Sequence, residues 1–455
     1  MSREPASPPR PPASEAADRR ARLLALLPGD ALIVVRGATP GPESRRFRQS
    51  NEFYYLTGLA APGAYLLLDA GTRRASVYLP HRDPRRERSD GPSLAAEDEA
   101  AVLELSGADS VAGPERLPLD LAALLFRSPR PTYTPFAPFE GVSTSRDSAL
   151  AALAWAAADP FGSGLSTEAG LAAALRSHFP QCDVRDVSPA LDTLRLLKSE
   201  HELQLLRAAA RICGEATIAA MRSTAPGVLE HELEAVATFV FRQSGAAGPG
   251  YEAIVAGGPN AWHGHYNAND APLRDGDLVL MDYAPDFGYY TSDIGRMWPV
   301  NGRYADWQRE LYGFVLAYHH ELIARIEPGV TPAAVLAGAA GAMRSYIDAT
   351  TFSKPSFRTA CEEALVFAGH LSHPVGMSVH DVGDYDNRPF EPGLVFSVDP
   401  MIWVPDERLY VRVEDTVAVT AEGVENLTGF VPLELEDVER ELTKPGLLQL
   451  WKEQT

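Results

Sequence analysis

The spacing of apolar and polar residues predicts two regions of different architecture. Between residues 20 and 190, short apolar runs alternate with stretches of helical periodicity such as Ala21–Leu27. The predicted strands are Ala31–Val35, Ala64–Leu68 and Ser76–Leu79. Strands that alternate with helices indicate an α/β domain. The first 18 residues are rich in Pro, Ser and Ala, so we expect a flexible tail there.

A helix start signal marks the opening of the second region. Ser199 and Glu202 form a capping box, and an apolar stripe at helical spacing follows at Leu203, Leu206, Ala210 and Cys213. A chain of 455 residues also exceeds the ~250–300 residues that one hydrophobic core usually serves. We therefore expect a tail at 1–18, an α/β domain at 19–190 and a second domain at 191–455.

Two aspartates in the second region are placed as if to hold a cation. The runs Leu278–Tyr283 and Tyr289–Ile294 flank a break with Pro285 and Gly288, which predicts a β-hairpin. A turn centred between residues 287 and 288 puts Asp282 directly opposite Asp293. Facing carboxylates repel each other, and a divalent metal ion would offset that repulsion. The alternatives are a register slipped by one residue, or an Asp that only caps a turn.

Further candidate ligands follow in the sequence. His370, His373 and His380 lie within eleven residues, and Asp399 follows an apolar run. The next strand alternates, with Val411, Val413, Val417 and Val419 on one face and Arg412, Glu414 and Thr416 on the other, which predicts one buried face. Each residue alone has an ordinary interpretation as a turn or solvated residue. The order Asp, Asp, His, Asp, Glu predicts a dinuclear metal site.

The chain resembles the pita-bread metallopeptidases, and within them aminopeptidase P and prolidase. The resemblance rests on LRLLKSEHELQLLRAA at 194–209, HYNAN at 265–269, the Asp and His segments above, and FRQSNEFYYLTGL at 47–59. It implies an α/β accessory domain followed by an α+β pita-bread catalytic domain. The implied activity is metal-dependent hydrolysis of the bond between an N-terminal residue and a following proline.

The resemblance also implies a role for each candidate residue. The five metal-ligand positions are Asp282, Asp293, His373, Asp399 and Glu414. His265 and His380 match histidines that contact substrate and assist proton transfer, and Glu414 matches a carboxylate that can also act as general base. Arg412 matches an arginine that supports the ligands, and His370 is either a wall of the site or a support. Oxygen-rich ligands favour two Mn²⁺ ions, although Co²⁺, Zn²⁺ or Fe²⁺ would fit.

The sequence departs from the family at four positions. Asp399 stands where a Glu is usual, Gly295 where Thr is common and Trp403 where a Tyr is common, and His370 precedes the His ligand by three residues where four are expected. For Asp399 we expect an inward shift of the strand after Val395. The alternative functions are a prolidase, a lyase acting on a small acid, and a metal-free binding module. Binding modules of this fold lose the ligand pattern that this chain keeps.

Composition narrows the classes of partner. The formal net charge of −20 argues against nucleic acid and anionic membranes. The three cysteines, Cys182, Cys213 and Cys361, do not form a CxxC motif, and an odd number of cysteines cannot all pair as disulfides. The N-terminus lacks the apolar run of a signal peptide, so we expect a cytoplasmic protein. The expected partners are proline-containing peptides and further copies of the chain, as a dimer or tetramer.

Overall fold

The computed structural model describes residues 8–39, 46–126, 128–160 and 165–452. The chain forms two compact units, an N-terminal unit of Arg10–Arg195 and a C-terminal unit built from Leu196–Thr455. The boundary therefore lies at residue 195, slightly later than the predicted 190.

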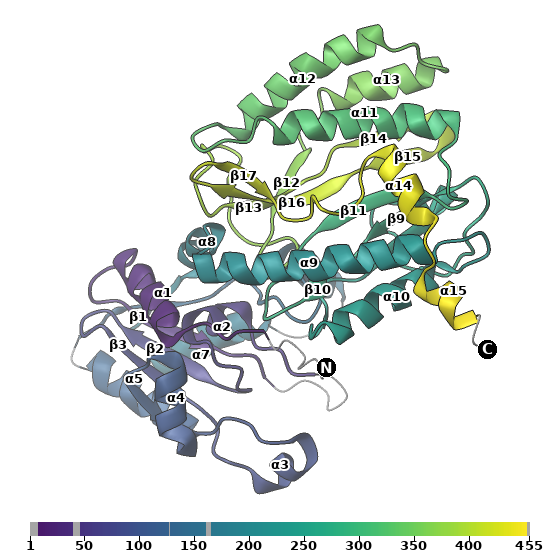
Figure 1. The fold of residues 1–455 in the computed structure, drawn as a ribbon. Coiled ribbons are helices and arrows are strands. Elements are labelled where there is room, and N and C mark those ends of the chain that lie inside the picture. Colours follow the sequence, from purple (N-terminus) through teal and green to yellow (C-terminus); the bar gives the residue numbers. More distant parts are fainter. Residues whose placement is uncertain (1–7, 40–45, 127, 161–164, 453–455) are drawn as a thin grey trace. The chain divides into compact units, whose positions relative to one another are not determined.

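A mixed six-stranded sheet forms the centre of the N-terminal unit (Figure 1). Its order is β4-β3-β2-β1-β5-β6, in which β1 is antiparallel to β2 and parallel to β5, and β5 is parallel to β6. The strands are β1 (Leu32–Arg36), β2 (Tyr65–Asp69), β3 (Arg74–Tyr78), β4 (Ser110–Ala112), β5 (Pro131–Thr134) and β6 (Asp183–Asp186). The helices are α1 (Ala13–Ala25), α2 (Asn51–Thr57), α3 (Pro84–Asp90), α4 (Glu99–Ser106), α5 (Leu117–Phe126), α6 (Arg146–Ala158), α7 (Thr167–His178) and α8 (Ser188–Leu196). The predicted α/β architecture of this region is confirmed.

The N-terminal end of this unit corrects one prediction. Helix α1 begins at Ala13, so the expected tail is wrong for residues 13–18, while residues 1–7 lie outside the described part. The helix is held because the Arg20 guanidinium donates to the carbonyl oxygens of Leu56, Ser106 and Gly107 at 2.7–2.9 Å. The prediction of a tail from local composition failed because hydrogen bonds to distant residues leave no signal in the local sequence.

An antiparallel sheet in the order β12-β13-β16-β11-β9-β8, with β17 on β16, forms the centre of the C-terminal unit. Its strands are β8 (Ile254–Gly257), β9 (Leu278–Asp282), β11 (Ile294–Pro299), β12 (Leu371–Pro374), β13 (Val395–Val398), β16 (Glu414–Thr420) and β17 (Gly423–Asn426). Two short ribbons add β7 (Gly248–Pro249) with β10 (Pro285–Asp286), and β14 (Met401–Val404) with β15 (Leu409–Arg412).

Helices cover this sheet in two groups. In Figure 1, α9 and α10 form one layer and α11, α12 and α13 another, with strands between them. The helices are α9 (Glu200–Ser223), α10 (Glu230–Gln243), α11 (Asp306–Ile323), α12 (Pro332–Ala349), α13 (Pro355–Ala364), α14 (Leu435–Leu442) and α15 (Leu447–Lys452). The capping box that begins α9 is confirmed, because Ser199 Oγ accepts from the Glu202 amide and the Glu202 carboxylate accepts from the Ser199 amide.

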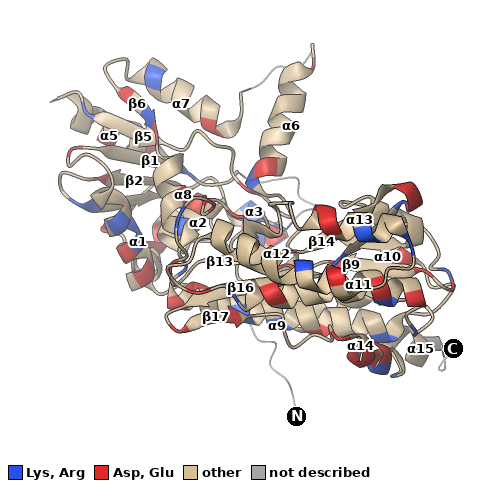
Figure 2. Cartoon of the chain, turned by 90° about the horizontal axis from the view of Figure 1, so that it is seen from above, with Lys and Arg blue, Asp and Glu red and all other residues tan. Residues whose placement is uncertain are grey.

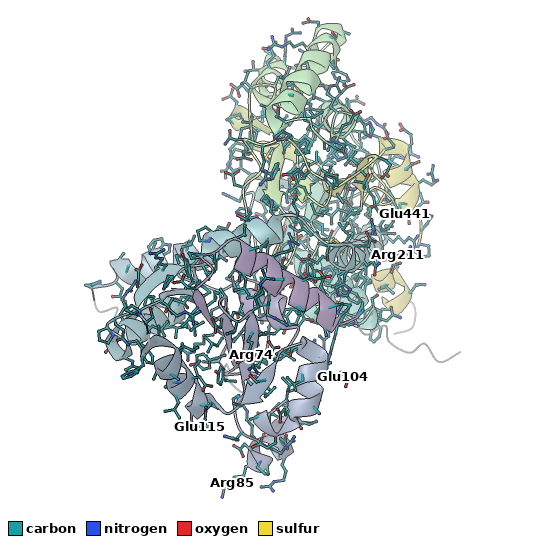
Figure 3. The ribbon with its side chains drawn as sticks, turned by 90° about the vertical axis from the view of Figure 1, so that its left-hand side faces the viewer. Arg74, Arg85, Glu104, Glu115, Arg211 and Glu441 are labelled. Carbon is teal, nitrogen blue, oxygen red and sulfur yellow. The ribbon has the colours of Figure 1, made fainter. Side chains whose placement is uncertain are left out.

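Charged residues are spread over the surface of both units. Helix α14 carries four acidic residues and one arginine, and it is mostly red in Figure 2. Figure 3 labels residues of both signs, among them Arg74 and Glu115 of the N-terminal unit and Glu441 of the C-terminal unit, where Glu441 pairs with Arg222 at 2.5 Å. None of the described helices combines the length and apolarity that a membrane span requires.

Candidate metal centre and active site

The pairing of β9 with β11 differs from the predicted hairpin. Asp282 lies opposite Gly295 and not opposite Asp293, and β11 begins only at Ile294. The pairing of β9 with β11 ends at Asp282, because Pro285 and Asp286 pair with β7 instead. A tight turn at Phe287–Tyr290 follows. The register is thus displaced by two residues. Because side chains alternate with a period of two, the shift leaves both aspartates on the same side.

The ligand candidates meet because their strands are neighbours in the sheet. Gly295 of β11 pairs with Asp282 on one side and with Glu414 of β16 on the other. On the next strand, Val398 pairs with Asp415, so Asp399 follows directly beside Glu414. Sequence positions more than a hundred residues apart therefore form one row of carboxylates.

A tyrosine that the sequence analysis did not single out joins the two aspartates. The hydroxyl of Tyr251 lies 2.6 Å from Asp282 Oδ1 and 3.0 Å from Asp293 Oδ1, so it donates its proton between them. Burial, with the two carboxylates beside it, raises the pKa of Tyr251 well above its usual value. The residue follows a Gly-Pro-Gly run that has no chemical signature, so only the fold could bring it to notice.

One cation lies among the acidic groups. The Arg412 guanidinium donates to Asp282 Oδ2, and its Nη1 lies 3.5 Å from Asp399 Oδ2 and 3.2 Å from Glu414 Oε2. The Ser397 hydroxyl donates to the other oxygen of Glu414. A single buried arginine therefore orients three carboxylates.

His373 lies at the other side of Asp293. Its Nδ1 lies 3.2 Å from the Pro374 carbonyl oxygen, to which it donates a hydrogen bond. The lone pair of Nε2 is then available to bind a metal ion. Nε2 lies 3.4 Å from Asp293 Oδ2, and donor atoms of Asp293, His373 and Glu414 all lie within 4.8 Å of one another. Burial, followed by the nearby His380, lowers the pKa of His373 to about 3. The imidazole is therefore neutral, as a metal ligand must be.

The electrostatics of this cluster fit a bound cation. Burial raises the pKa values of Asp293, Asp399 and Glu414, and the repulsion of neighbouring carboxylates raises those of Asp293 and Asp399 further. Asp399 Oδ1 is buried without a hydrogen-bond partner among the described residues, whereas Glu414 Oε2 has the ion pair with Arg412. Buried carboxylates need a compensating charge, and Arg412 alone does not balance four of them. Hard oxygen donors with one imidazole suit divalent ions.

The strand that carries Glu414 corrects another prediction. One continuous strand with one buried face was expected, but Arg412 ends β15 and Glu414 begins β16, and Arg412, Glu414 and Thr416 are all buried. The Thr416 hydroxyl bonds to the backbone of Asp293, accepting from its amide at 2.8 Å and donating to its carbonyl oxygen at 2.7 Å. The polar face is covered because it forms the wall of the site.

The remaining histidines divide into two groups. The His380 ring lies 4.0 Å from the His373 ring and 6.3 Å from that of the exposed His265, centroid to centroid. His370 is fully buried, where its Nε2 lies 2.7 Å from the Ala364 carbonyl oxygen, and burial lowers its pKa to about 4. Its own carbonyl accepts from the Asp399 amide at 2.8 Å. The structure thus places His265 and His380 toward the ligand cluster and His370 behind it.

The other departures from the family also contact the site or its walls. A Cβ on Gly295 would lie 2.9 Å from the Cβ of Glu414, closer than two such atoms can approach. Trp403 packs against the rings of Phe367 and Tyr410, with centroid distances of 5.5 and 5.3 Å.

Comparison with known proteins agrees with this geometry. Residues 204–421 match the metallopeptidase family M24, and residues 16–132 match the aminopeptidase P N-terminal domain. An Xaa-Pro aminopeptidase of Haemophilus influenzae is 31% identical over 462 residues, with 94% of this chain and 97% of the relative covered. The chain therefore belongs to metallopeptidase family M24.

Within that family the chain falls in the aminopeptidase P branch. The structure of Escherichia coli aminopeptidase P with the inhibitor Pro-Leu superimposes with a TM-score of 0.77 at 27% identity, covering 96% of this chain and 99% of that one. Pseudomonas aeruginosa aminopeptidase PepP gives a TM-score of 0.75 at 28% identity, with 95% and 98% covered. The pita-bread fold expected for the C-terminal unit is thus confirmed.

Proposed function

We propose that this protein is an Xaa-Pro aminopeptidase that removes the N-terminal residue from peptides with proline at the second position. The observation that carries the proposal is the row of buried carboxylates formed by Asp282, Asp293, Asp399 and Glu414, with His373 beside it. Relatives of similar length are named Xaa-Pro aminopeptidases, and they match the chain through both units.

The five ligand positions would hold two divalent ions. Asp293 would be central to the ligand set, because one of its oxygens shares Tyr251 with Asp282 while the other faces His373. Bound divalent ions lower the pKa of a water molecule so that it becomes a nucleophile near neutral pH. We propose Mn²⁺ as the native metal because oxygen ligands predominate. A structure of the E. coli enzyme is described as zinc-substituted, so the metals must be compared directly.

The side chains around the cluster would carry the remaining steps. Glu414 would accept the proton of the attacking water at Oε2, while Ser397 and Arg412 hold the carboxylate in position. His380 would donate to the oxyanion that develops on the scissile carbonyl, since its ring lies against the ligand His373. His265, farther out and exposed, would contact the substrate backbone. Arg412 and His370 would act only by holding the ligands.

A peptide assay tests this proposal and separates it from the alternatives. Metal-stripped protein would be reloaded with Mn²⁺, Co²⁺, Zn²⁺ or Fe²⁺ and incubated with Xaa-Pro-Xaa peptides, Xaa-Pro dipeptides and matched peptides with Ala in place of Pro. We expect release of the first residue from the Xaa-Pro-Xaa peptides only, and fastest with Mn²⁺. Cleavage of dipeptides alone would indicate a prolidase. Cleavage of none of these peptides at any metal loading would contradict the proposal.

Assembly and location belong to the same proposal. Helix α6 has no buried residue and leaves Trp155 80% and Leu150 51% exposed. Exposed apolar side chains of this size are often buried against another subunit. We therefore propose a homo-oligomer, which sedimentation of the wild type and of Trp155→Glu would test. All three cysteines are unpaired thiols, as in a reducing cytoplasm. One relative from Arabidopsis thaliana is named as mitochondrial, so cell fractionation is needed.

A further inference from the structure

The N-terminal unit contains a second polar pocket that is separate from the metal centre. It lies at the carboxyl ends of the parallel neighbours β1 and β5, where Arg36 and Thr134 are the last strand residues. From β1 the chain continues to β2 on one side, and from β5 it continues to β6 on the other. Ligands of open α/β sheets bind at the carboxyl ends of the strands, and this pocket lies at that edge of the two parallel strands.

Unsatisfied polar groups face this pocket. The hydroxyls of Thr134 and Ser50 and the Nε of Arg36 are buried without a hydrogen-bond partner among the described residues, and all three residues line the pocket. Thr134 is 0% exposed and Ser50 is 2% exposed. Ser50 precedes α2 but makes no capping bond with its side chain. Buried hydrogen-bonding groups are rarely left unpaired, so these three groups need partners that the described residues do not supply, either water or a bound solute.

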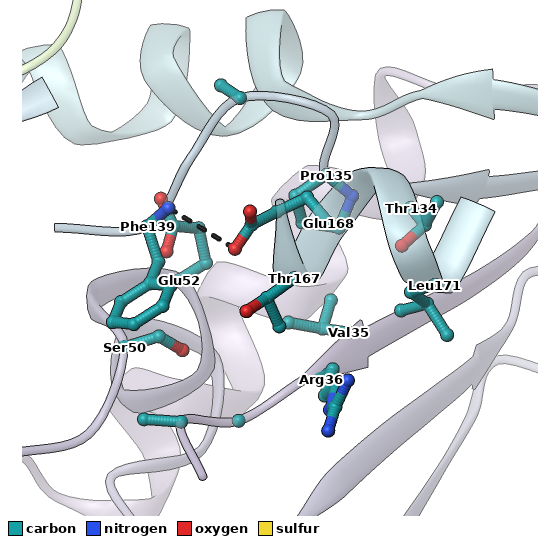
Figure 4. Close-up of a pocket in the computed structure, with 13 residues that line it drawn as sticks. Val35, Arg36, Ser50, Glu52, Thr134, Pro135, Phe139, Thr167, Glu168 and Leu171 are labelled. Atoms are coloured by element: carbon teal, nitrogen blue, oxygen red, sulfur yellow. Dashed lines mark hydrogen bonds between the residues drawn. The ribbon is translucent and has the colours of Figure 1, made fainter. Parts of the chain in front are cut away.

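One end of the pocket carries Glu168 and Glu52, of which Glu52 is paired with Arg146 and Arg195, and the other end carries Arg36. In Figure 4 the carboxylates of Glu52 and Glu168 lie together beside Phe139, and the guanidinium of Arg36 lies across the pocket from them. Glu168 is oriented by the Phe139 amide, which donates to Oε1 at 3.3 Å, and Glu52 by Arg146 at 2.9 Å. Helix α7, of twelve residues, starts at Thr167 on the pocket wall and carries Glu168 in its first turn.

The space and the apolar wall limit the size of the ligand. The pocket is narrow, with about 370 Å³ of free space that includes its opening to solvent. Side chains such as Val35 and Leu171 supply apolar surface between the charged ends. A large ligand would not fit, and an isolated anion or cation would leave one charged end unmatched.

We propose that this pocket binds a free α-amino acid with a small apolar side chain. The carboxylate of the ligand accepts from Arg36 Nε and the Thr134 hydroxyl, and its ammonium group donates to Glu168. The Ser50 hydroxyl completes the polar contacts, and the ligand side chain lies against Val35 and Leu171. The proposal accounts for each of the three unpaired buried groups, and it does not depend on the metal centre.

Calorimetric titration of the full-length protein with alanine tests the proposal. Alaninamide, which lacks the carboxylate, and N-acetylalanine, which lacks the ammonium group, are the matched ligands. We expect one saturable site per chain for alanine and no saturable binding for either analogue. Equal binding of alanine and both analogues, or no saturable heat with alanine, would overturn the proposal.

Variants separate this pocket from the metal centre, where a product amino acid could also bind. Arg36→Gln and the near-isosteric Thr134→Val should each weaken alanine binding by about 10-fold or more, since each removes a donor to a charged group. Asp293→Asn, at the metal cluster, should leave the affinity unchanged. The reverse pattern would assign the binding to the metal centre and overturn the proposal. Ser50→Ala provides a variant that keeps α2 intact, because no capping bond is lost, and it should also bind alanine more weakly.

Discussion

Replacement of Asp293 by Asn is the sharpest test of the metal centre. Asn keeps the side-chain volume and an acceptor for the Tyr251 hydroxyl, which lies 3.0 Å from Oδ1. The change removes the charge and the second oxygen, which faces His373 at 3.4 Å. If Asp293 bridges two ions, both lose a ligand, so the metal content should fall from two ions per chain to one or fewer.

The expected size of the effect follows from linkage. An ion present at 100 times its Kd stabilises the folded chain by about 2.7 kcal/mol. For a domain of this size, 1 kcal/mol corresponds to a Tm shift of ~2–4 °C. Each lost ion should therefore remove about 5–11 °C of the rise in Tm that metal produces. In metal-free protein the sign reverses: burial and the neighbouring carboxylates raise the pKa of Asp293, so loss of this charge should leave Tm equal or higher.

The measurement combines metal analysis after exhaustive dialysis with calorimetric melting, with and without a chelator. Asp406→Asn, which alters an exposed carboxylate of the same unit, is the matched control and should behave as wild type. Two ions per chain in Asp293→Asn, together with an undiminished metal-dependent rise in Tm, would refute the assignment of Asp293 as a ligand.

Three other changes test separate parts of the site and the fold. His380→Ala and His265→Ala should lower kcat, by ~10²–10³-fold where an oxyanion donor is lost, with unchanged metal content; a parallel loss of metal would make these histidines ligands. Asp399→Glu should reduce activity at saturating metal because the site is closed around the shorter side chain, and a faster enzyme would show instead that the native ion is held loosely. Burial, with Glu140 beside it, raises the pKa of Glu52 from 4.5 to about 7, so the folded protein binds a proton more tightly than the unfolded chain, and stability is lost as pH rises through this range. Glu52→Gln should flatten that decline, which melting curves from pH 4.5 to pH 8 would detect, and an unchanged slope would contradict the shifted pKa.

The sequence predicted which side chains come together better than it predicted how their strands pair. The hairpin register was wrong by two residues, yet Asp282 and Asp293 still share a face because side chains alternate with a period of two. A one-residue error would have turned one of them away. The pattern of polar residues in strands therefore survives errors in turn geometry, provided that the error is even.

Contacts between distant segments were beyond the reach of sequence patterns. Tyr251 bonds to residues 31 and 42 positions away, and Arg20 holds α1 to carbonyls 36 and 86 positions away. Neither residue has a local motif, since the packing of separate elements creates its role. For His370 the sequence left open a wall of the site or a support, and the structure buries its ring and joins its carbonyl oxygen to the Asp399 amide, as a support would be.

Gly295 and Asp399 are best understood as one change in the site. Gly295 lies between Asp282 and Glu414 in the sheet, and any side chain there would require Glu414 to move, because even a Cβ would come within 2.9 Å. The absence of that side chain allows Glu414 to lie closer to its neighbour on β11. Asp399, one methylene shorter than the usual Glu, is anchored by its amide to the His370 carbonyl at 2.8 Å, so its backbone position is fixed from behind. Asp399 and Gly295 flank Glu414 on its two neighbouring strands, so both set the space around that carboxylate. Glu at 399 would add a methylene at a position whose backbone is already held, and we therefore expect it to reduce activity.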